Sequence, residues 1–243
     1  AHSKGCLDGI MTISGGKIYG GSASYRGGNI NSYATLNITG GEIYGGVCEN
    51  QGGNIHIEGT LNISGGKIYD GVAGTNGGNI SSIKTMVISG GEIYNGLAQA
   101  NPIVTLDSNG KYTVLSGDSN RYRGVGGNIY GAGADNNITI SGGKIYGGLA
   151  NGIGGGNLFS VTGPVKIEGG MLWGGIANAD NSQAGTAELN YAYSTCGGSV
   201  YINQGTFTMT GGSICIDAEG KPAGGTTLPS GSEGGNLYLY NTS

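Results

Sequence analysis

The sequence is poor in charge, proline, cysteine and histidine. Charged residues make up 11% of the 243 residues, and there are 4 prolines, 4 cysteines and 2 histidines. The net charge of −4 is small, and the arginines (Arg26, Arg121 and Arg123) belong to no basic run, which argues against nucleic-acid binding. No stretch approaches 18 consecutive apolar residues, so we expect no membrane-spanning helix.

Few residues could bind a metal or drive a reaction. The two histidines are His2 and His56, the aspartates are scattered, and no nucleophile–base set is evident. The cysteines match no zinc-binding spacing, and they allow at most two disulfides or four buried or capped thiols: Cys6, Cys48, Cys196 and Cys215. We therefore expect no cofactor, no metal and no catalytic residue.

Glycine, by contrast, is abundant, at 56 of 243 residues against a usual share of roughly 7%. Collagen is excluded because glycine does not recur at every third position and proline is scarce. A flexible linker is excluded by the hydrophobic share of 37% and by the 15 tyrosines. A helical protein is disfavoured because each interior glycine costs about 1 kcal/mol relative to alanine. The composition predicts an all-β fold with many tight turns.

Two motifs recur along the chain. The first motif is MTISGGKIYGG with its variants, and its five clear copies start at Met11, Leu36, Leu61, Met86 and Ile138. The first four of these copies begin 25 residues apart. Two more divergent copies start at Val165 and Phe207. The second motif, GGN followed by Ile or Leu, begins at Gly27, Gly52, Gly77, Gly126, Gly155 and Gly234, with GGSV at Gly197. Such a period is the signature of a stacked repeat protein.

Each repeat is expected to contain three short β segments, which in the third copy are Asn54–Ile57, Thr60–Ser64 and Lys67–Tyr69. Period-2 alternation points Leu61 and Ile63 inward. This pattern predicts a three-faced parallel β-helix of about seven coils. It forms a single domain over residues 1–243, with coils that open near residues 27, 52, 77, 126, 155, 197 and 234.

The repeat resembles the right-handed parallel β-helix (pectin-lyase-like) superfamily over nearly the whole chain. Its GGN-Ile units are similar to the glycine–glycine repeats of polymorphic outer-membrane and autotransporter-type adhesins, although the FxxN half of that pattern is absent. The resemblance implies a right-handed coil, an extracellular or cell-surface location, and either adhesion or the cleavage of acidic polysaccharides. The chain starts at Ala1 without a signal-peptide pattern, so we expect a mature product or an excised segment.

Equivalent positions of successive coils should stack into ladders. One ladder alternates in charge: Lys17, Glu42, Lys67, Glu92 and Lys144. A second is aromatic: Tyr19, Tyr44, Tyr69, Tyr94, Tyr146 and Trp173. The aromatic ladder is either a platform for sugars or a set of rings that stack on one another. A third ladder contains the asparagines that follow GG, which we expect to hydrogen-bond inside the coil.

Three insertions interrupt the period at the same corner of the coil, at residues 97–125, 176–196 and 217–233. The first contains two β-rich arms around Asn109-Gly110, which predicts a β-hairpin. Insertions on one side of a repeat protein often carry its binding function. The predicted ligand-binding residues are Tyr112, Arg121, Tyr122, Arg123, Tyr191, Tyr193 and Trp173. The alternative is that these loops only make subunit contacts.

The leading hypothesis is a non-catalytic, extracellular adhesin or stalk that binds a glycan or a host surface through this insertion edge. A second hypothesis is a filament subunit that associates head to tail. A third is a polysaccharide lyase or hydrolase, for which Asp107 and Asp118 are a conceivable acidic pair. Ice binding by the outward threonines is a minor alternative, and Lys166 interrupts that array.

Overall fold

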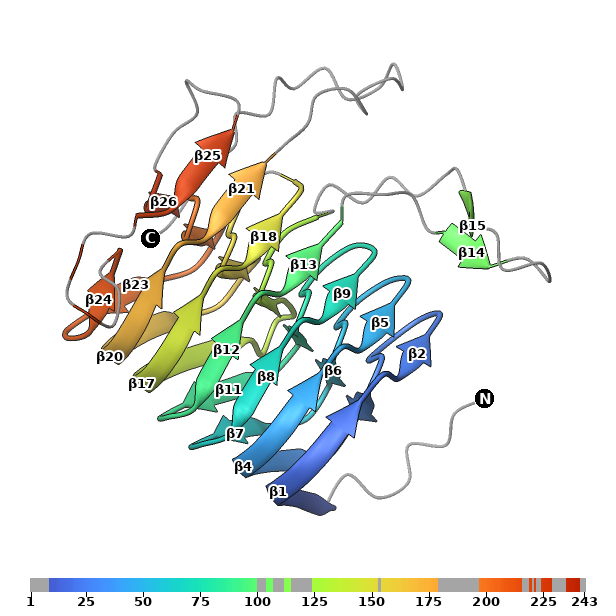
Figure 1. The fold of residues 1–243 in the computed structure, drawn as a ribbon. Coiled ribbons are helices and arrows are strands. Elements are labelled where there is room, and N and C mark those ends of the chain that lie inside the picture. Colours follow the sequence, from blue (N-terminus) through green and yellow to red (C-terminus); the bar gives the residue numbers. More distant parts are fainter. Residues whose placement is uncertain are drawn as a thin grey trace.

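In a computed structural model the regular elements of the chain are β-strands, joined by turns and loops (Figure 1). The described residues are 9–99, 104–106, 112–114, 124–152, 154–178, 197–215, 219, 221, 224–228 and 235–240. Within these ranges the only regular secondary structure is β-strand. The strands form three parallel sheets and one antiparallel hairpin. The same ranges contain no helix that could cross a membrane.

The first sheet contains ten strands and carries the TISGGKIY-type segments. Its strands are β1 (Ile10–Tyr19), β4 (Thr35–Tyr44), β7 (Leu61–Ile63), β8 (Lys67–Tyr69), β11 (Thr85–Ile88), β12 (Glu92–Tyr94), β17 (Asn137–Tyr146), β20 (Val165–Trp173), β23 (Phe207–Met209) and β24 (Ser213–Ile214). Successive repeats pair in register, so that Ile43 of β4 lies beside Ile68 of β8.

The other two parallel sheets contain seven short strands each. The second sheet follows the GGN motifs and consists of β3 (Ile30–Ser32), β6 (Ile55–Ile57), β10 (Ile80–Ser82), β16 (Ile129–Gly131), β19 (Leu158–Ser160), β22 (Val200–Ile202) and β26 (Leu237–Leu239). The third sheet consists of β2 (Ser22–Ala23), β5 (Val47–Cys48), β9 (Val72–Ala73), β13 (Leu97–Ala98), β18 (Leu149–Ala150), β21 (Ile176–Asn178) and β25 (Thr226–Leu228). Three parallel sheets built from one repeating segment are compatible with a three-faced β-helix.

The hydrophobic core lies between the first and second sheets. In one repeat Ile55 and Ile57 of β6 are buried together with Leu61, Ile63 and Ile68 of the first sheet, each at most 1% exposed. Burying such a side chain contributes about 1.5–3 kcal/mol, which exceeds its loss of rotamer entropy. The third sheet turns small residues inward: Cys48, Ala73, Ala98, Ala150 and Ala177. The predicted inward positions of Leu61, Ile63 and Ile68 are confirmed.

The division of each repeat into strands differs from the sequence-based expectation. The LNIS and KIY segments were expected on different faces, yet β7 and β8 belong to the same sheet, and β4 runs through both segments as one strand. The pairing register shifts at the glycine pair, which marks a bulge or irregularity in the sheet. The third sheet lies instead in the five-residue corner after IYGG, where two-residue strands are too short for hydrophobic alternation to reveal them.

The glycine pair inside the first sheet is required by close packing. Gly41 has a φ of +82°, and a Cβ atom at this position would lie 2.9 Å from the backbone of Gly15 and Gly16 in the preceding repeat. A left-handed φ and close neighbouring backbone both favour glycine. Asp70 and Asn95 replace the first glycine of the IYGG pair in two repeats, and both adopt positive φ, which these residue types tolerate.

The asparagines after GG form a continuous internal column, as expected. The asparagine column consists of Asn29, Asn54, Asn79, Asn128 and Asn157. Each side-chain Nδ2 donates to the Oδ1 of the next member at 2.7–2.9 Å. It also donates to the carbonyl of an aromatic-ladder residue, and each Oδ1 accepts a glycine N–H, as Asn79 does from Gly71. The asparagine amides therefore provide hydrogen-bond partners for one another and for the backbone at the corner. This agrees with the expectation that these asparagines hydrogen-bond inside the coil.

The outer face of the second sheet is covered by the chain itself over part of the stack, whereas Asn31 of β3 is exposed. Single bridge residues form a short stack over it: Arg26, Gln51, Asn76 and Val125. The outward positions beneath change from polar to aromatic along the stack: Asn31, His56, Ser81, Tyr130, Phe159, Tyr201 and Tyr238. A second hydrophobic cluster therefore lies outside the main core.

The predicted β-hairpin is confirmed, because β14 (Val104–Leu106) pairs antiparallel with β15 (Tyr112–Val114). The insertion ranges 97–125, 176–196 and 217–233 each also contain a strand of the third sheet, namely β13, β21 and β25. These three strands belong to the third sheet, so each range also includes residues of the stacked repeat. Strands of two or three residues carry no visible period.

Cys48 and Cys215 are free thiols, so neither forms a disulfide. Burial raises the pKa of both thiols, most plainly for the buried Cys48. This agrees with the alternative of buried thiols for these two positions. Cys6 and Cys196 lie outside the described residues.

Candidate functional site

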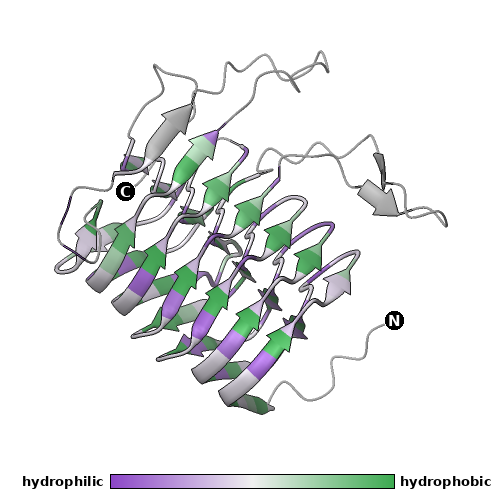
Figure 2. Cartoon of the chain, in the orientation of Figure 1, coloured by the Kyte–Doolittle hydropathy of each residue, from purple (hydrophilic) through white to green (hydrophobic). Residues whose placement is uncertain are grey.

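Five charged side chains form a row across the first sheet, which we call the charge row: Lys17, Glu42, Lys67, Glu92 and Lys144. Figure 2 shows hydrophilic parts of neighbouring strands lying side by side across this sheet. Lys17 Nζ lies 3.4 Å from Glu42 Oε2, and the Glu92 carboxylate lies 3.6 Å from Lys67 Nζ and 3.7 Å from Lys144 Nζ. The predicted alternation of charge is confirmed, including the direct pairing of Glu92 with Lys144 across the first insertion.

The lysines of the charge row are more exposed than the glutamates. The lysine side chains are 41–60% exposed and the glutamate side chains 30–34%. Exposed ion pairs of this kind contribute at most about 1 kcal/mol each. The row therefore adds little to stability, but it presents ammonium groups outermost and penalises a slipped register, which would stack like charges.

The aromatic ladder lies two residues further along the same strands, and we call it the aromatic row. Its members are Tyr19, Tyr44, Tyr69, Tyr94, Tyr146 and Trp173. Adjacent ring centroids are 4.4–5.1 Å apart, and the ring planes are within 9° of parallel. The rings therefore cover one another's faces, and the inner rings offer edges and hydroxyl groups. A platform of open ring faces, one of the two interpretations of the sequence, is wrong for these inner positions.

The two rows are joined by a hydrogen bond. Tyr69 Oη donates to Glu42 Oε2 at 3.1 Å. Desolvation, this hydrogen bond and the neighbouring carboxylate raise the pKa of Tyr69 to about 12. Desolvation likewise raises the pKa values of Tyr94 and Tyr146. These phenols are neutral near pH 7, and because the Tyr69 proton is directed to Glu42, the hydroxyls of Tyr94 and Tyr146 are the ones that can donate to a ligand.

Shallow hollows lie beside the charge row, over the glycine pairs. One, of about 590 Å³, is lined by Lys17, Glu42, Lys67 and Glu92 with the adjoining glycines. Another, of about 680 Å³, is lined by Glu92, Lys144, Met171 and glycines of four repeats. Both are open to solvent, and together they follow the direction in which the repeats stack. An extended molecule would fit this surface better than a compact one.

The predicted ligand-binding residues are only partly described. Trp173 ends the aromatic row and stacks on Tyr146 at 4.4 Å, so it belongs to the first sheet rather than to the insertion edge. Tyr112 begins β15 of the hairpin. The remaining predicted residues lie outside the described residues: Arg121, Tyr122, Arg123, Tyr191 and Tyr193. The structure therefore brings no two of the predicted residues together among those it describes.

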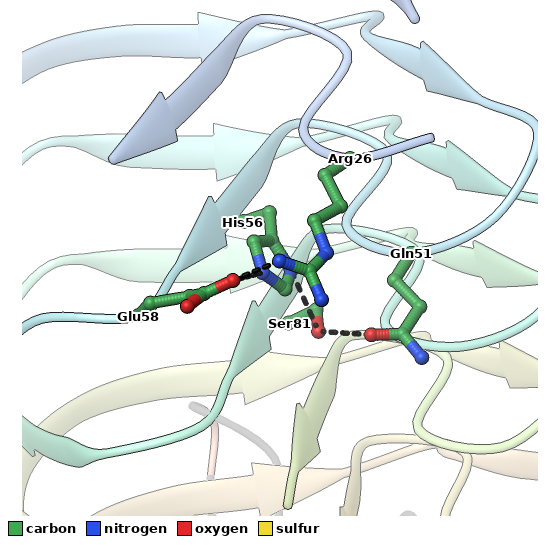
Figure 3. Close-up of polar contacts among 5 residues, drawn as sticks. All are labelled: Arg26, Gln51, His56, Glu58 and Ser81. Carbon is green, nitrogen blue, oxygen red and sulfur yellow. Dashed lines mark hydrogen bonds and ion pairs between the residues drawn. The ribbon is translucent and has the colours of Figure 1, made fainter. Parts of the chain in front are cut away.

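A buried polar cluster that sequence reasoning missed lies on the outer face of the second sheet (Figure 3). His56, in the middle of β6, is fully buried beneath Arg26 and Gln51. His56 Nδ1 lies 3.3 Å from Ser81 Oγ, which in turn donates to Gln51 Oε1 at 3.4 Å. The Arg26 guanidinium pairs with the Glu58 carboxylate. The cluster links the bridge residues to the sheet beneath them.

The protonation of His56 follows from these contacts. The Nδ1 atom of His56 shares a hydrogen bond with Ser81 Oγ, and the tautomer of the imidazole decides which of the two atoms donates. The other ring nitrogen, Nε2, has no hydrogen-bond partner and lies 3.7 Å from Glu58 Oε1. Burial, aided by the positive charge of Arg26, lowers the pKa of His56 to about 4. The imidazole is therefore neutral near pH 7.

This cluster is unsuited to covalent catalysis although it contains Ser, His and Glu. Ser81 and His56 are both 0% exposed, so a substrate would not reach either side chain. The described ranges contain no group of three or more His, Cys, Asp or Glu residues that could hold a metal ion. The signal that could have revealed the cluster is positional, because His56 aligns with Asn31 and Ser81 at the 25-residue period.

Comparisons of the chain with protein-family models, with curated proteins and with solved structures found no match. The candidate site therefore rests on its own geometry. It comprises the charge row, the aromatic row and the hollows beside them, and we call this surface the stripe.

Proposed function

We propose that the chain is a right-handed, three-faced parallel β-helix of about seven coils, of the pectin-lyase-like type. Its proposed role is that of a non-catalytic, extracellular or cell-surface module that binds an extended glycan. The observation that carries the proposal is the stripe, in which charged and aromatic side chains keep the same register over five repeats. Such a straight, periodic surface suits a periodic, linear polymer.

The chemistry of the stripe also favours a glycan. It presents ammonium groups, carboxylates and neutral phenols, which are the donors and acceptors that sugar hydroxyls require. Tyr19, at the end of the aromatic row, is 64% exposed and can offer one ring face to a sugar. A nucleic acid would require a stronger excess of positive charge than three lysines interleaved with two glutamates.

A glycan array probed with the whole chain tests this proposal. We expect binding to linear glycans, and we expect Tyr19→Ala together with Lys67→Gln to weaken it. The pair Arg121→Ala and Arg123→Ala serves as the comparison, because it alters the predicted insertion edge and leaves the stripe intact. Loss of binding only in the arginine pair would move the site to the insertion edge, and a blank array would contradict glycan binding altogether.

A second candidate is end-to-end self-association, favoured by the exposed edge of the first sheet. The outermost strand β1 pairs on one side only, with β4, among the described residues. Its Ile10 and Met11 side chains are 71% and 40% exposed. Exposed apolar strand edges promote pairing with another chain. Sedimentation at increasing concentration tests this: concentration-dependent rods that Ile10→Lys abolishes support it, and a monomer at all concentrations contradicts it.

A further inference from the structure

The distance between successive lysines of the charge row indicates how far apart the negative charges of a matching ligand should be. Neighbouring rings in the aromatic row are 4.8–5.1 Å apart between Tyr19 and Tyr146, which gives the spacing of successive repeats. Lysine occupies every second repeat of the charge row, so ammonium groups recur at about 10 Å along the stack. The intervening repeats present carboxylates.

The ammonium groups are the parts of the row that a ligand meets first. Lys17, Lys67 and Lys144 are 60%, 51% and 41% exposed. The carboxylates are already engaged: Glu92 contacts two lysines, and Glu42 contacts Lys17 and accepts the Tyr69 hydroxyl. Each lysine contacts a glutamate at a distance of 3.4–3.7 Å, which is an exposed and weak pair. A ligand carboxylate can therefore approach each lysine without breaking a strong contact.

We infer that the charge row binds a linear glycan that carries one carboxylate on every second sugar. This inference rests on the proposed function and names the glycan class. An extended hexopyranose chain advances by roughly one repeat spacing per sugar, so alternate carboxylates coincide with the lysines. The uncharged sugars between them lie over Glu42 and Glu92, where their hydroxyls can donate to the carboxylate oxygens.

The same geometry disfavours the other two charge patterns. A glycan with a carboxylate on every sugar places negative charge over Glu42 and Glu92, and like charges brought together oppose binding. A neutral glycan makes hydrogen bonds but gains nothing from the exposed ammonium groups. The alternation of Lys and Glu thus selects between glycans by their charge period, in addition to setting the register of the repeats.

The test compares three glycans of equal length on the whole chain: hyaluronan oligosaccharides, which alternate glucuronate with N-acetylglucosamine, oligogalacturonate, and chito-oligosaccharides. We expect hyaluronan oligosaccharides to bind at least tenfold more tightly than either of the others at low salt. Three exposed ion pairs contribute that much if each adds about half a kcal/mol. The advantage should shrink as salt is raised, because exposed pairs are screened.

Two variants separate charge spacing from net charge. Replacing all three lysines, as Lys17→Gln, Lys67→Gln and Lys144→Gln, should reduce the affinity for the alternating glycan to that for the neutral one. The exchange Glu42→Lys with Lys67→Glu keeps the net charge and breaks the alternation, so it should abolish the tenfold preference. Lys84→Gln is the matched control, because Lys84 is exposed before β11 and lies outside the row. Circular dichroism and melting curves verify that each variant keeps its sheets.

The possible outcomes separate this inference from the proposed function. Equal binding of all three glycans, sensitive to Tyr19→Ala, retains the glycan-binding function and overturns the charge-period inference. Tighter binding of oligogalacturonate also overturns it, since continuous negative charge would then be preferred. An exchanged variant that keeps the preference contradicts the role of spacing. Absence of binding to any glycan, with a folded protein, overturns both.

Discussion

The asparagine column and the charge row have the same period, yet they contribute in different ways. Asn54 and Asn79 are fully buried, and each amide bonds to two neighbouring asparagines and to corner backbone. The charge row stands in solvent, with lysines up to 60% exposed. Because a buried polar group that loses its partner costs far more than an exposed one, the inner column stabilises the stack. The outer row is left free to control register and recognition.

The largest expected effect comes from the glycine that holds the asparagine column in place. A Cβ atom at Gly53, next to Asn54, would overlap with the carbonyl oxygen of Gly78 and the amide nitrogen of Val72. Gly53→Ala should therefore lower the free energy of unfolding by more than about 4 kcal/mol or prevent folding. Gly45→Ala is the control, since Gly45 has only a left-handed φ of +60° and open space, for a cost of about 1–2 kcal/mol. Urea denaturation measures both, and equal losses would contradict the steric argument.

The next largest effect is expected for removal of a buried amide. Asn79→Ala leaves the Gly71 N–H and one Nδ2–H of Asn54 without an acceptor and interrupts the column. Each buried polar group without a hydrogen-bond partner costs about 1–3 kcal/mol. We therefore expect the free energy of unfolding to fall by roughly 3–5 kcal/mol. The matched control is Asn62→Ala on the outer face, where Asn62 donates to Asn37 in a second, partly exposed asparagine pair. That change should cost less than about 1 kcal/mol, and a similar loss at both sites would remove the distinction between inside and outside.

Burial also predicts that the stability of the protein depends on pH through His56. The pKa of His56 is about 4 in the folded protein and near 6.5 when unfolded. Above pH 6.5 the imidazole is neutral in both states, so its contribution to stability is fully present. As pH falls from 6.5 to 4, only the unfolded state takes up the proton, and stability drops by about 3 kcal/mol. Unfolding measured from pH 8 to 4 should show this slope.

His56→Asn provides the comparison for this slope, because Asn31 occupies the equivalent position in the neighbouring repeat. The variant should lose the acid sensitivity between pH 6.5 and 4 that the imidazole causes. Identical pH profiles for the two proteins would contradict the burial of a neutral His56.

The smallest effect is expected in the charge row itself. Lys67→Gln removes one exposed contact to Glu92 at 3.6 Å and should change the free energy of unfolding by less than about 1 kcal/mol. The difference should vanish at high salt. If Lys67→Gln lowered the free energy of unfolding by more than about 2 kcal/mol, and the loss persisted at 1 M salt, the charge row would stabilise the stack as the asparagine column does. That result would contradict the difference between the charge row and the asparagine column.

The repeat period allowed much of the interior to be predicted. The 25-residue spacing and the alternation around Leu61 and Ile63 identified the inward residues, the ladders and the asparagine column. The charge alternation even identified the direct pairing of Glu92 with Lys144. These features follow from the sequence because stacking forces equivalent residues into contact, so a periodic sequence specifies its own neighbours.

Other features could not be predicted because they depend on how one repeat lies against the next. The sequence assigned KIY to a separate face, but tertiary pairing joined it to the sheet of LNIS and placed a third sheet in the corner. Similarly, His56 is buried because the bridge residues Arg26 and Gln51 lie over it (Figure 3), and nothing in the sequence of β6 reveals that cover. The bridge residues are single residues between strands, so their sequence has no hydrophobic alternation from which their position could be predicted.

The sequence by itself thus determined which residues stack, since a fixed period and strict alternation leave few other registers. The tertiary structure alone decided which stacked groups a ligand can reach. The aromatic row shows the difference, because Tyr44, Tyr69 and Tyr94 were foreseen as neighbours, while their ring planes within 6° of parallel became known only from the packed sheet. The physical reason is that spacing along the chain fixes proximity, whereas the exposure of a ring face depends on the side-chain geometry that close packing selects.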